Sequence, residues 1–543
     1  MLQIETIENL TGFGDKNSPG EYYHSENLIQ GQFGLEANIA ITTESATGSP
    51  ARFNWFTEYG STPYAVDTSG KIFSRSTSWS EARNPGSSSG NGLITDQKGR
   101  LLYARNQYLG MYNGTWNDTW KDFVTSTTEF RPMDTYEDWV AIGNKNTISL
   151  LNVTDDSFSA DSLTLPTDFV VRAIKSNQSG ILVGANVGGR SVIFLWDARA
   201  TRSISDWIWF EYKLQSICKY GSRWIVTNQK QQFITDGYST TALPSFPDVS
   251  ERTETFRCIP AGTMVLGDKL FTANTDINLS LNRLKSGLWM QDLTNGLFNF
   301  VTVENGCVTD MTMGALYKDS SFNIFISYST NLPSGNHVGQ IKNTSPTSAT
   351  LIFPKLGQGT NYKVAKGAKL DISSIFKTNL VYPSGSFVVD LKIYNFKRPL
   401  WGFGTTRSAS SNTNELNVDG TAGGSNNAKI GDEVTILSGI NAGQIRHITS
   451  ISGAGTSTEI WTLNSALPQL TDNGAVFNVQ PFQLVASKTI SFSDYGELRD
   501  VYFDIRNNIK GKKFLLKIII KSISNISLAA NSLSFIYEDL GVL

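Results

Sequence analysis

The segment NGLITDQKGRLLYARNQYLGMYNGTW, residues 91–116, decides the fold. Short β-rich runs alternate with tight turns, and one turn runs from Asp96 to Gly99. Glycine and asparagine are common in such turns because the backbone needs positive φ angles there. The pattern predicts a strand, a glycine turn, a second strand and then a third strand that ends in an aromatic residue.

Similar segments recur between about residue 50 and residue 345. They are TPYAVDTSGKIFSRS (62–76), QSICKYGSRWIVTNQKQQFITDGYS (215–239), GTMVLGDKLFTANTD (262–276) and SGLWMQDLTNGLFNFV (286–301). The turns at 67–70, 96–99 and 266–269 are expected to be equivalent. A repeat of roughly 40–50 residues with three or four strands is typical of β-propeller blades, which stack because one blade alone exposes both faces of its sheet. The length predicts six or seven blades. Successive hairpins of a sandwich or barrel are the alternative.

The pattern changes after Pro354. Longer β-rich runs at 387–396, 501–508, 514–522 and 532–540 predict a C-terminal β-sandwich. Residues 404–428 are rich in Ser, Asn, Thr and Gly and predict a linker or mobile loop, and 430–468 predict a compact barrel-like unit. We therefore expect an all-β chain with an N-terminal arm (1–50), a propeller (51–350), a sandwich (351–403 and 481–543) and a small inserted β-barrel-like module (404–480).

Charge and hydropathy argue against two classes of partner. Charged residues make up 17% of the chain and the net charge is −2, so no nucleic-acid-binding surface is predicted. The basic run Lys510–Lys521 is interpreted as a strand with lysines on its exposed side rather than a binding patch. The longest apolar run, Phe514–Ile520, is far shorter than the ~20 residues of a membrane helix, so no membrane insertion is expected. The N-terminus has no secretory signal pattern, which predicts synthesis and folding in a cytoplasm.

No cofactor or metal site is predicted. Three widely spaced cysteines, Cys218, Cys258 and Cys307, form no CxxC pair, which disfavours zinc and redox sites. The three histidines, His24, His337 and His447, lack a His or Cys at metal-ligand spacing.

A propeller glycosidase is the catalytic alternative. A sialidase-like site needs an arginine triad, a Tyr–Glu pair and an acidic Asp, and its usual turn motif is matched only weakly by SRSTSWSEAR, residues 74–83. Nothing in the pattern selects Arg75, Arg100, Arg105 or Arg223 as a triad, and no pair of carboxylates stands out. The sequence therefore predicts a protein that is not an enzyme, with no catalytic residues.

Tryptophans near strand ends have two interpretations. These are Trp116, Trp120, Trp139, Trp207, Trp209, Trp224 and Trp289. Packing between blades is favoured, because large aromatic side chains gain most from burial. Stacking on a sugar ring is the alternative. TWNDTW, residues 115–120, places two tryptophans among polar residues, so Trp116 and Trp120 are the candidate glycan or partner contacts.

Three segments resemble proteins of bacteriophage tails. Residues 430–468 are similar to small β modules of phage tail and fibre proteins, with matching points at Gly431, Asp432, Gly439, Asn441, Gly443, Leu463 and Pro468. The ending LSFIYEDLGVL resembles the close of phage propeller proteins that end in a sandwich. The opening SPGEYYHSENLIQGQFG, residues 18–34, is similar to the start of tail nozzle-type proteins, in which the chain first lays a strand across the propeller rim.

The resemblance implies a structural protein of the virion, made in the cytoplasm of a bacterial host and located in the tail tip, nozzle or an appendage. Expected partners are other tail proteins and symmetry-related copies of the chain, with a host-surface glycan as a further candidate. A glycan receptor-binding protein is the second functional hypothesis, and a propeller glycosidase is the third.

Overall fold

The computed structural model consists of strands and turns. It describes residues 2–7, 24–26, 29–31, 34–36, 40–48, 50–86, 91–199, 203–244, 257–275, 286–294, 298–301, 311–331, 334–342, 348–352, 356, 361–374, 385–395, 402–419, 428–436, 440–441, 444–492, 498–505, 509–511, 514–521 and 528–540. No helix long and apolar enough to cross a membrane occurs within these ranges.

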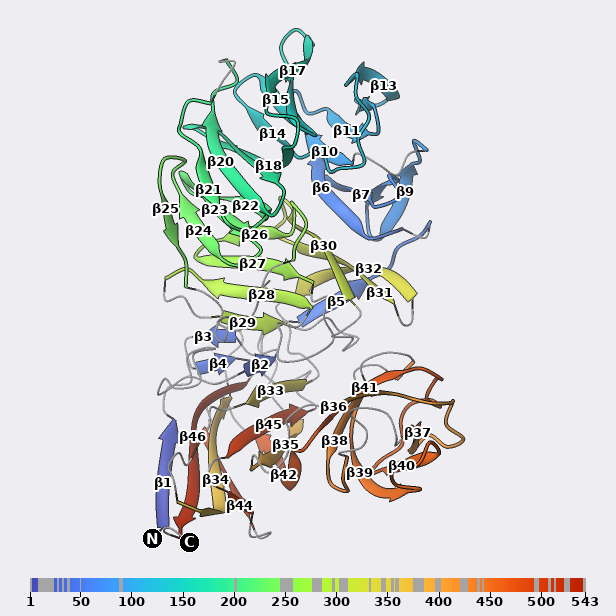
Figure 1. Ribbon diagram of the computed structural model, residues 1–543, viewed down its shortest axis with the longest axis vertical. Helices are drawn as coiled ribbons and strands as arrows, with labels where there is room; N and C mark the ends of the chain where they lie inside the picture. The colour runs from blue at the N-terminus through green and yellow to red at the C-terminus, as the bar shows by residue number, and fades with distance from the viewer. Residues whose placement is uncertain are drawn as a thin grey trace.

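Seven four-stranded antiparallel sheets form the blades of a β-propeller. They follow one another around a ring in the upper part of Figure 1. Blades 1 to 4 consist of β6 (Phe53–Tyr59), β7 (Thr62–Asp67), β8 (Ile72–Arg75), β9 (Trp79–Arg83); β10 (Gly92–Thr95), β11 (Leu101–Arg105), β12 (Tyr108–Tyr112), β13 (Trp116–Asp122); β14 (Met133–Tyr136), β15 (Trp139–Asn144), β16 (Thr147–Asn152), β17 (Phe158–Thr164); and β18 (Val170–Asn177), β19 (Gly180–Val187), β20 (Arg190–Trp196), β21 (Ile208–Phe210). Blades 5 to 7 consist of β22 (Leu214–Tyr220), β23 (Arg223–Asn228), β24 (Gln232–Thr235), β25 (Thr240–Ala242); β26 (Thr263–Leu266), β27 (Lys269–Asn274), β28 (Gly287–Asp292), β29 (Phe298–Val301); and β30 (Met311–Lys318), β31 (Ile324–Asn331), β32 (Ser334–Lys342) with β5 (Ala40–Glu44).

An apolar cluster lies between each pair of neighbouring blades. Trp55, Val66 and Leu101 join blades 1 and 2, and equivalent clusters continue around the ring. The last cluster joins blade 7 to blade 1 through Phe325 and Phe53. The ring is therefore closed, and the predicted all-β propeller of six or seven blades is confirmed.

Closure of the ring depends on the N-terminal segment. Strand β5 pairs with β32 as the fourth strand of blade 7. The Glu44 carboxylate then accepts hydrogen bonds from Arg75 Nε at 2.9 Å and Arg75 Nη2 at 2.7 Å, both from blade 1. Trp79 Nε1, also from blade 1, donates to the same carboxylate at 3.0 Å. Residues far apart in sequence thus fasten the first blade to the last.

Two turns that were expected to be equivalent occupy different places. The Asp67 turn joins the second and third strands of blade 1, whereas the Asp96 turn joins the first and second strands of blade 2. Both have the same local structure, because Oδ1 of the aspartate accepts from the backbone N–H groups two and four residues later. Gly70 and Gly99 adopt φ of 83° and 72°. Local sequence fixes the turn but not its position in the blade.

A two-sheet sandwich lies below the propeller in Figure 1, with both chain termini at its lower edge. One sheet contains β1 (Leu2–Ile7), β3 (Ile29–Gly31), β4 (Gly34–Glu36), β34 (Lys363–Ser374), β43 (Leu498–Asp504), β44 (Lys510–Gly511) and β46 (Leu528–Asp539). The other contains β2 (His24–Glu26), β33 (Ser348–Ile352), β35 (Gly385–Tyr394), β42 (Gln483–Phe492) and β45 (Leu515–Lys521). Alternate residues of both sheets, including Leu370, Phe387 and Phe535, form the shared core.

The inserted module is a curled six-stranded sheet in the order β36-β41-β38-β39-β40-β37. Its strands are β36 (Gly402–Thr405), β37 (Glu415–Val418), β38 (Glu433–Ile436), β39 (Ile445–Ser452), β40 (Glu459–Leu463) and β41 (Val476–Gln480). A bridge between Thr406 and Val418 joins the two edges, and Trp461 is fully buried inside.

Strand pairing crosses the boundaries drawn from sequence. The arm assigned to 1–50 supplies β1 to β4 to the sandwich and β5 to the propeller, and β33 of the sandwich begins at Ser348. β2 and β3 also lie against β29, the outer strand of blade 6 (Figure 1). The N-terminal segment is therefore shared by both units, while the division into domains stays a prediction.

A buried charged triad joins the module to the sandwich. Lys392 on β35 and Lys517 on β45 are directly opposed in register. Glu433 of the module lies between them, bonded to Lys392 and to Lys517 Nζ at 2.6 Å, and all three side chains are buried. The interpretation of the basic run as a strand with exposed lysines is thus wrong at Lys517, because the module covers that face; Lys521 is exposed as expected.

Candidate functional site

The two candidate tryptophans lie on β13, the outer strand of blade 2, and face in opposite directions. Residues four apart in a regular strand share a face. Here the register shifts between Leu109 and Met111, so that 118–120 lie opposite Gly110 alone. Because of this bulge, Trp116 packs toward blade 1 and Trp120 toward blade 3.

Trp120 belongs to a bonded contact between blades 2 and 3. Its ring lies 5.0 Å from the Arg100 guanidinium carbon and 4.9 Å from Lys121 Nζ. It also packs against the apolar cluster of these two blades. Both cations are held by polar partners, so this ring forms part of the joint between blades.

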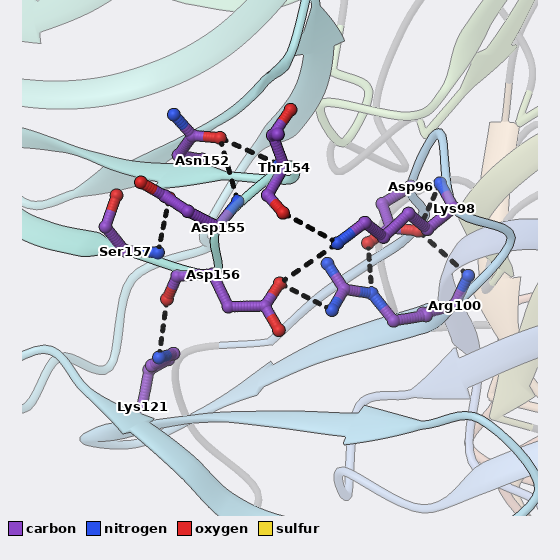
Figure 2. A network of polar contacts seen from close by, with 9 residues as sticks. All are labelled: Asp96, Lys98, Arg100, Lys121, Asn152, Thr154, Asp155, Asp156 and Ser157. Atoms are coloured by element: carbon purple, nitrogen blue, oxygen red, sulfur yellow. Dashed lines mark hydrogen bonds and ion pairs between the residues drawn. The ribbon is translucent and has the colours of Figure 1, made fainter.

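Figure 2 shows how those cations are held. Arg100 bonds Asp96 through Nε at 2.7 Å and Asp156 through Nη1 at 2.7 Å. Lys121 Nζ donates to the backbone oxygen of Asp156 at 2.7 Å. Lys98 Nζ donates to the Thr154 carbonyl at 3.1 Å (Figure 2). The first turn of blade 2 is thereby fixed to the 153–157 loop of blade 3.

Trp116 belongs to a set of aromatic residues between blades 1 and 2. Its ring stacks on Tyr112 with centroids 4.3 Å apart, and Tyr103 meets it edge-on at 5.6 Å. Tyr112 in turn lies 5.1 Å from Tyr59 and 6.5 Å from Tyr64, both of blade 1. We call Tyr59, Tyr64, Tyr112 and Trp116 the blade 1–2 aromatic patch; each of its side chains is partly exposed.

A polar network supports this patch from the blade 2 side. The Tyr103 ring crosses above Gly110, where a Cβ atom would lie 2.2 Å from the ring, and its hydroxyl donates to Asp118 Oδ1 at 2.5 Å. Arg83 of blade 1 bonds both oxygens of the same carboxylate. Burial and the hydrogen bond to Asp118 raise the pKa of Tyr103 above its usual value. The network therefore holds Tyr103 in place beneath Trp116.

The other tryptophans are mostly structural. Trp224 and Trp289 are buried within their blades, and Trp207 stacks on Phe194 at 5.5 Å. Trp209 is half exposed and packs at 6.0 Å against Phe169. Packing against other side chains of the propeller thus accounts for these four tryptophans.

The four arginines considered for a catalytic triad have separate partners. Arg75 binds Glu44, Arg100 binds Asp96 and Asp156, and Arg105 binds backbone oxygens of Pro85 and Asp118. Arg223 begins β23 and is exposed. Among the described residues no group of three His, Cys, Asp or Glu side chains could hold a metal ion.

Histidines and cysteines are dispersed over the fold. His337 stacks on Tyr328 at 5.1 Å, and burial lowers its pKa. His24 is on β2 and His447 on β39. Burial raises the thiol pKa of Cys218 to about 12 and that of Cys258 to about 11, so both behave as small apolar side chains. Cys307 lies outside the described residues.

Comparisons with known proteins yield structural likeness without a family. No protein-family model and no curated protein matches the chain. The designed protein Ika8 aligns over 57% of this chain and 97% of its own, with 8% identity and a TM-score of 0.36. The extracellular domain of the two component system BT4673 from B. thetaiotaomicron aligns over 78% of this chain and 47% of its own, with 10% identity and a TM-score of 0.39. The AfRom2 CNH domain aligns over 56% of this chain and 98% of its own, with 11% identity and a TM-score of 0.35.

Proposed function

We propose that this chain is a structural protein of a bacteriophage tail, in the tip, the nozzle or an appendage, where it serves as an assembly platform and a host-contacting surface. Sequence motifs at 18–34, 430–468 and 533–543 support the assignment to a tail. The architecture supports the mechanical role, because the ring is closed by a strand that comes from the sandwich side of the molecule.

The shared N-terminal segment is the observation that carries this proposal. Its first strand pairs with β46, the last strand of the chain, and its fifth strand completes blade 7. Only three residues separate the end of β4 in the sandwich from the start of β5 in the propeller, so moving the two units apart beyond the reach of this short connection would break main-chain hydrogen bonds in one of them. A component that transmits load inside a particle needs this kind of coupling, whereas independent domains would move on a linker.

Surfaces for partners are available on this body. The outer face of the seven-stranded sandwich sheet carries the exposed side chains Leu2, Ile4 and Tyr502. Symmetric assemblies use one patch repeatedly, so such a face suits contacts with other copies or neighbouring tail proteins.

The test is the presence of the chain in purified phage particles. Quantitative mass spectrometry and immunogold labelling should find it in the tail at a constant number of copies per virion. Its absence from purified particles, in a lysate that contains the protein, would refute the proposal. A glycan receptor-binding role is the second candidate, and the blade 1–2 aromatic patch is the observation that favours it.

A further inference from the structure

We propose that the blade 1–2 aromatic patch binds a neutral glycan, by stacking a pyranose ring on Trp116 and hydrogen-bonding sugar hydroxyls to Tyr59, Tyr64 and Tyr112. This inference rests on the host-contacting part of the proposed function and is independent of the assembly part.

The topology brings the patch to one edge of the propeller. Tyr59 ends β6, and Tyr64 is the third residue of β7, the strand that follows the turn. Tyr112 ends β12 and Trp116 begins β13, on either side of another turn. First-to-second and third-to-fourth turns of an antiparallel blade lie at the same end of the sheet. Both pairs of aromatic residues therefore reach the same side of the ring, where Ser61 and Thr115 of the turns are exposed.

Three phenol groups of the patch lack hydrogen-bond partners in the part of the chain that the structure describes. Three other tyrosines of the propeller have bonded hydroxyls: Tyr103 bonds Asp118, Tyr317 bonds Glu58 and Tyr328 bonds Thr43. The three rings lie close together, with centroids 6.0 Å apart for Tyr59 and Tyr64, 5.1 Å for Tyr59 and Tyr112 and 6.5 Å for Tyr64 and Tyr112. These hydroxyls belong to partly exposed side chains and are not among the buried polar atoms, so they are accessible to a ligand that supplies hydroxyl groups.

The patch is rigid before any ligand arrives. Trp116 stacks on the Tyr112 ring and makes a T-shaped contact with Tyr103, and the Arg83–Asp118–Tyr103 network fixes the strand that carries it. Pre-organisation of this kind favours binding because few side chains must be immobilised.

The charges nearby favour a neutral ligand. Two arginines accompany this network. Arg83 bonds both oxygens of the Asp118 carboxylate, and Arg105 donates to the backbone oxygens of Pro85 and Asp118. Because both guanidinium groups already have partners, a phosphate or an acidic sugar would gain little from them. A saccharide has the two properties that the patch requires, an apolar ring face for Trp116 and hydroxyl groups for the phenols.

The test uses the full chain and an array of neutral and acidic bacterial surface oligosaccharides. We expect the wild-type chain to bind a neutral oligosaccharide on the array. The affinity of each variant for that oligosaccharide is then measured by calorimetric titration. Tyr64→Phe/Tyr112→Phe keeps both rings and should weaken binding about 5- to 140-fold, since each lost hydrogen bond contributes about 0.5–1.5 kcal/mol and 1.4 kcal/mol is tenfold. Trp116→Ala should abolish binding on the array. The matched control Tyr238→Phe, at an exposed tyrosine of blade 5, should bind as the wild type does.

Three results would overturn the inference: no neutral oligosaccharide binds, only acidic ones bind, or the double phenylalanine variant binds like the wild type. Near-ultraviolet circular dichroism identifies a variant that has lost its fold, and Tyr112→Phe alone then repeats the measurement. Should the inference fail while the chain is present in purified virions, the tail assignment stands. Should glycan bind while the chain is absent from virions, the tail assignment fails instead.

Discussion

Replacing Glu433 by glutamine should release the inserted module from the sandwich. The glutamate separates two buried lysines that are directly opposed on neighbouring strands. Burial alone would raise its pKa, but Lys517 and Lys392 hold that pKa well below its usual range. The carboxylate therefore stays ionised in the folded protein even in mild acid.

The expected cost is about 3–5 kcal/mol, the range for removing one partner of a buried ion pair. Glutamine has nearly the same shape but no charge, so Lys392 and Lys517 would repel each other in a site without solvent. Burial already lowers the pKa of Lys392, and Glu433 partly offsets that effect. The variant should therefore also drive one lysine toward its neutral form.

Urea unfolding and hydrogen exchange measure the two consequences. The variant should unfold at lower urea concentration, and peptides covering β35, β45 and β38 should exchange faster. The matched control Glu538→Gln removes an exposed pair with Lys366 and should cost less than about 1 kcal/mol. Replacing all three buried residues together by leucine or methionine should restore most of the stability. A Glu433→Gln protein within 1 kcal/mol of the wild type, with unchanged exchange, would refute the role given to the triad.

Three further predictions concern the module, blade 2 and the ring closure. Burial and the Lys392 charge lower the pKa of His447 to about 4, so this histidine takes up a proton at higher pH in the unfolded chain than in the folded one. The free energy of unfolding should therefore be greatest above about pH 6.5 and fall by roughly 3 kcal/mol toward pH 4. Urea titrations at both pH values should show a smaller loss for His447→Gln. Gly110→Val should displace the Tyr103 ring and lower the free energy of unfolding by about 1–3 kcal/mol through overpacking. The control Gly189→Ala, where a Cβ meets open space, should change the melting temperature little, and equal effects of the two variants would contradict the packing of Tyr103 on Gly110. Glu44→Gln should speed exchange in β5 more than Glu81→Gln, whose pair with Lys71 is partly exposed, and equal exchange would show that Glu44 does not fasten the ring.

The propeller was predictable because its signals are local. The turns that begin at Asp67 and Asp96 show the same pattern in the sequence and the same hydrogen bonds in the structure. The position of strand β5 was not predictable, since its partner β32 lies almost 300 residues later. The alternation of apolar and polar residues along a strand is the same whichever sheet the strand joins. The blade count could be bounded from length, but the origin of the last strand could not.

The candidate site was predictable in composition but not in geometry. TWNDTW identified Trp116 and Trp120 as candidate contacts, but it did not predict the bulge opposite Gly110 that turns the two rings toward different blades. Tyr59 and Tyr64 were missed because they come from the preceding blade and carry no motif. Lys517 and Glu433 were missed because their contact depends on how the inserted module docks, which no local pattern encodes.

A disulfide across the seventh blade tests the closed ring most directly. Thr42 and Gln340 are paired in register on β5 and β32, so cysteines there are within reach of a bond. The closed ring predicts that Thr42→Cys/Gln340→Cys oxidises completely in the native protein and raises the urea midpoint, by about 3–5 kcal/mol for so long a loop, and that reduction reverses the gain. A native double variant whose thiols stay free, or an oxidised one that forms only bonds between molecules, would contradict closure by the N-terminal strand.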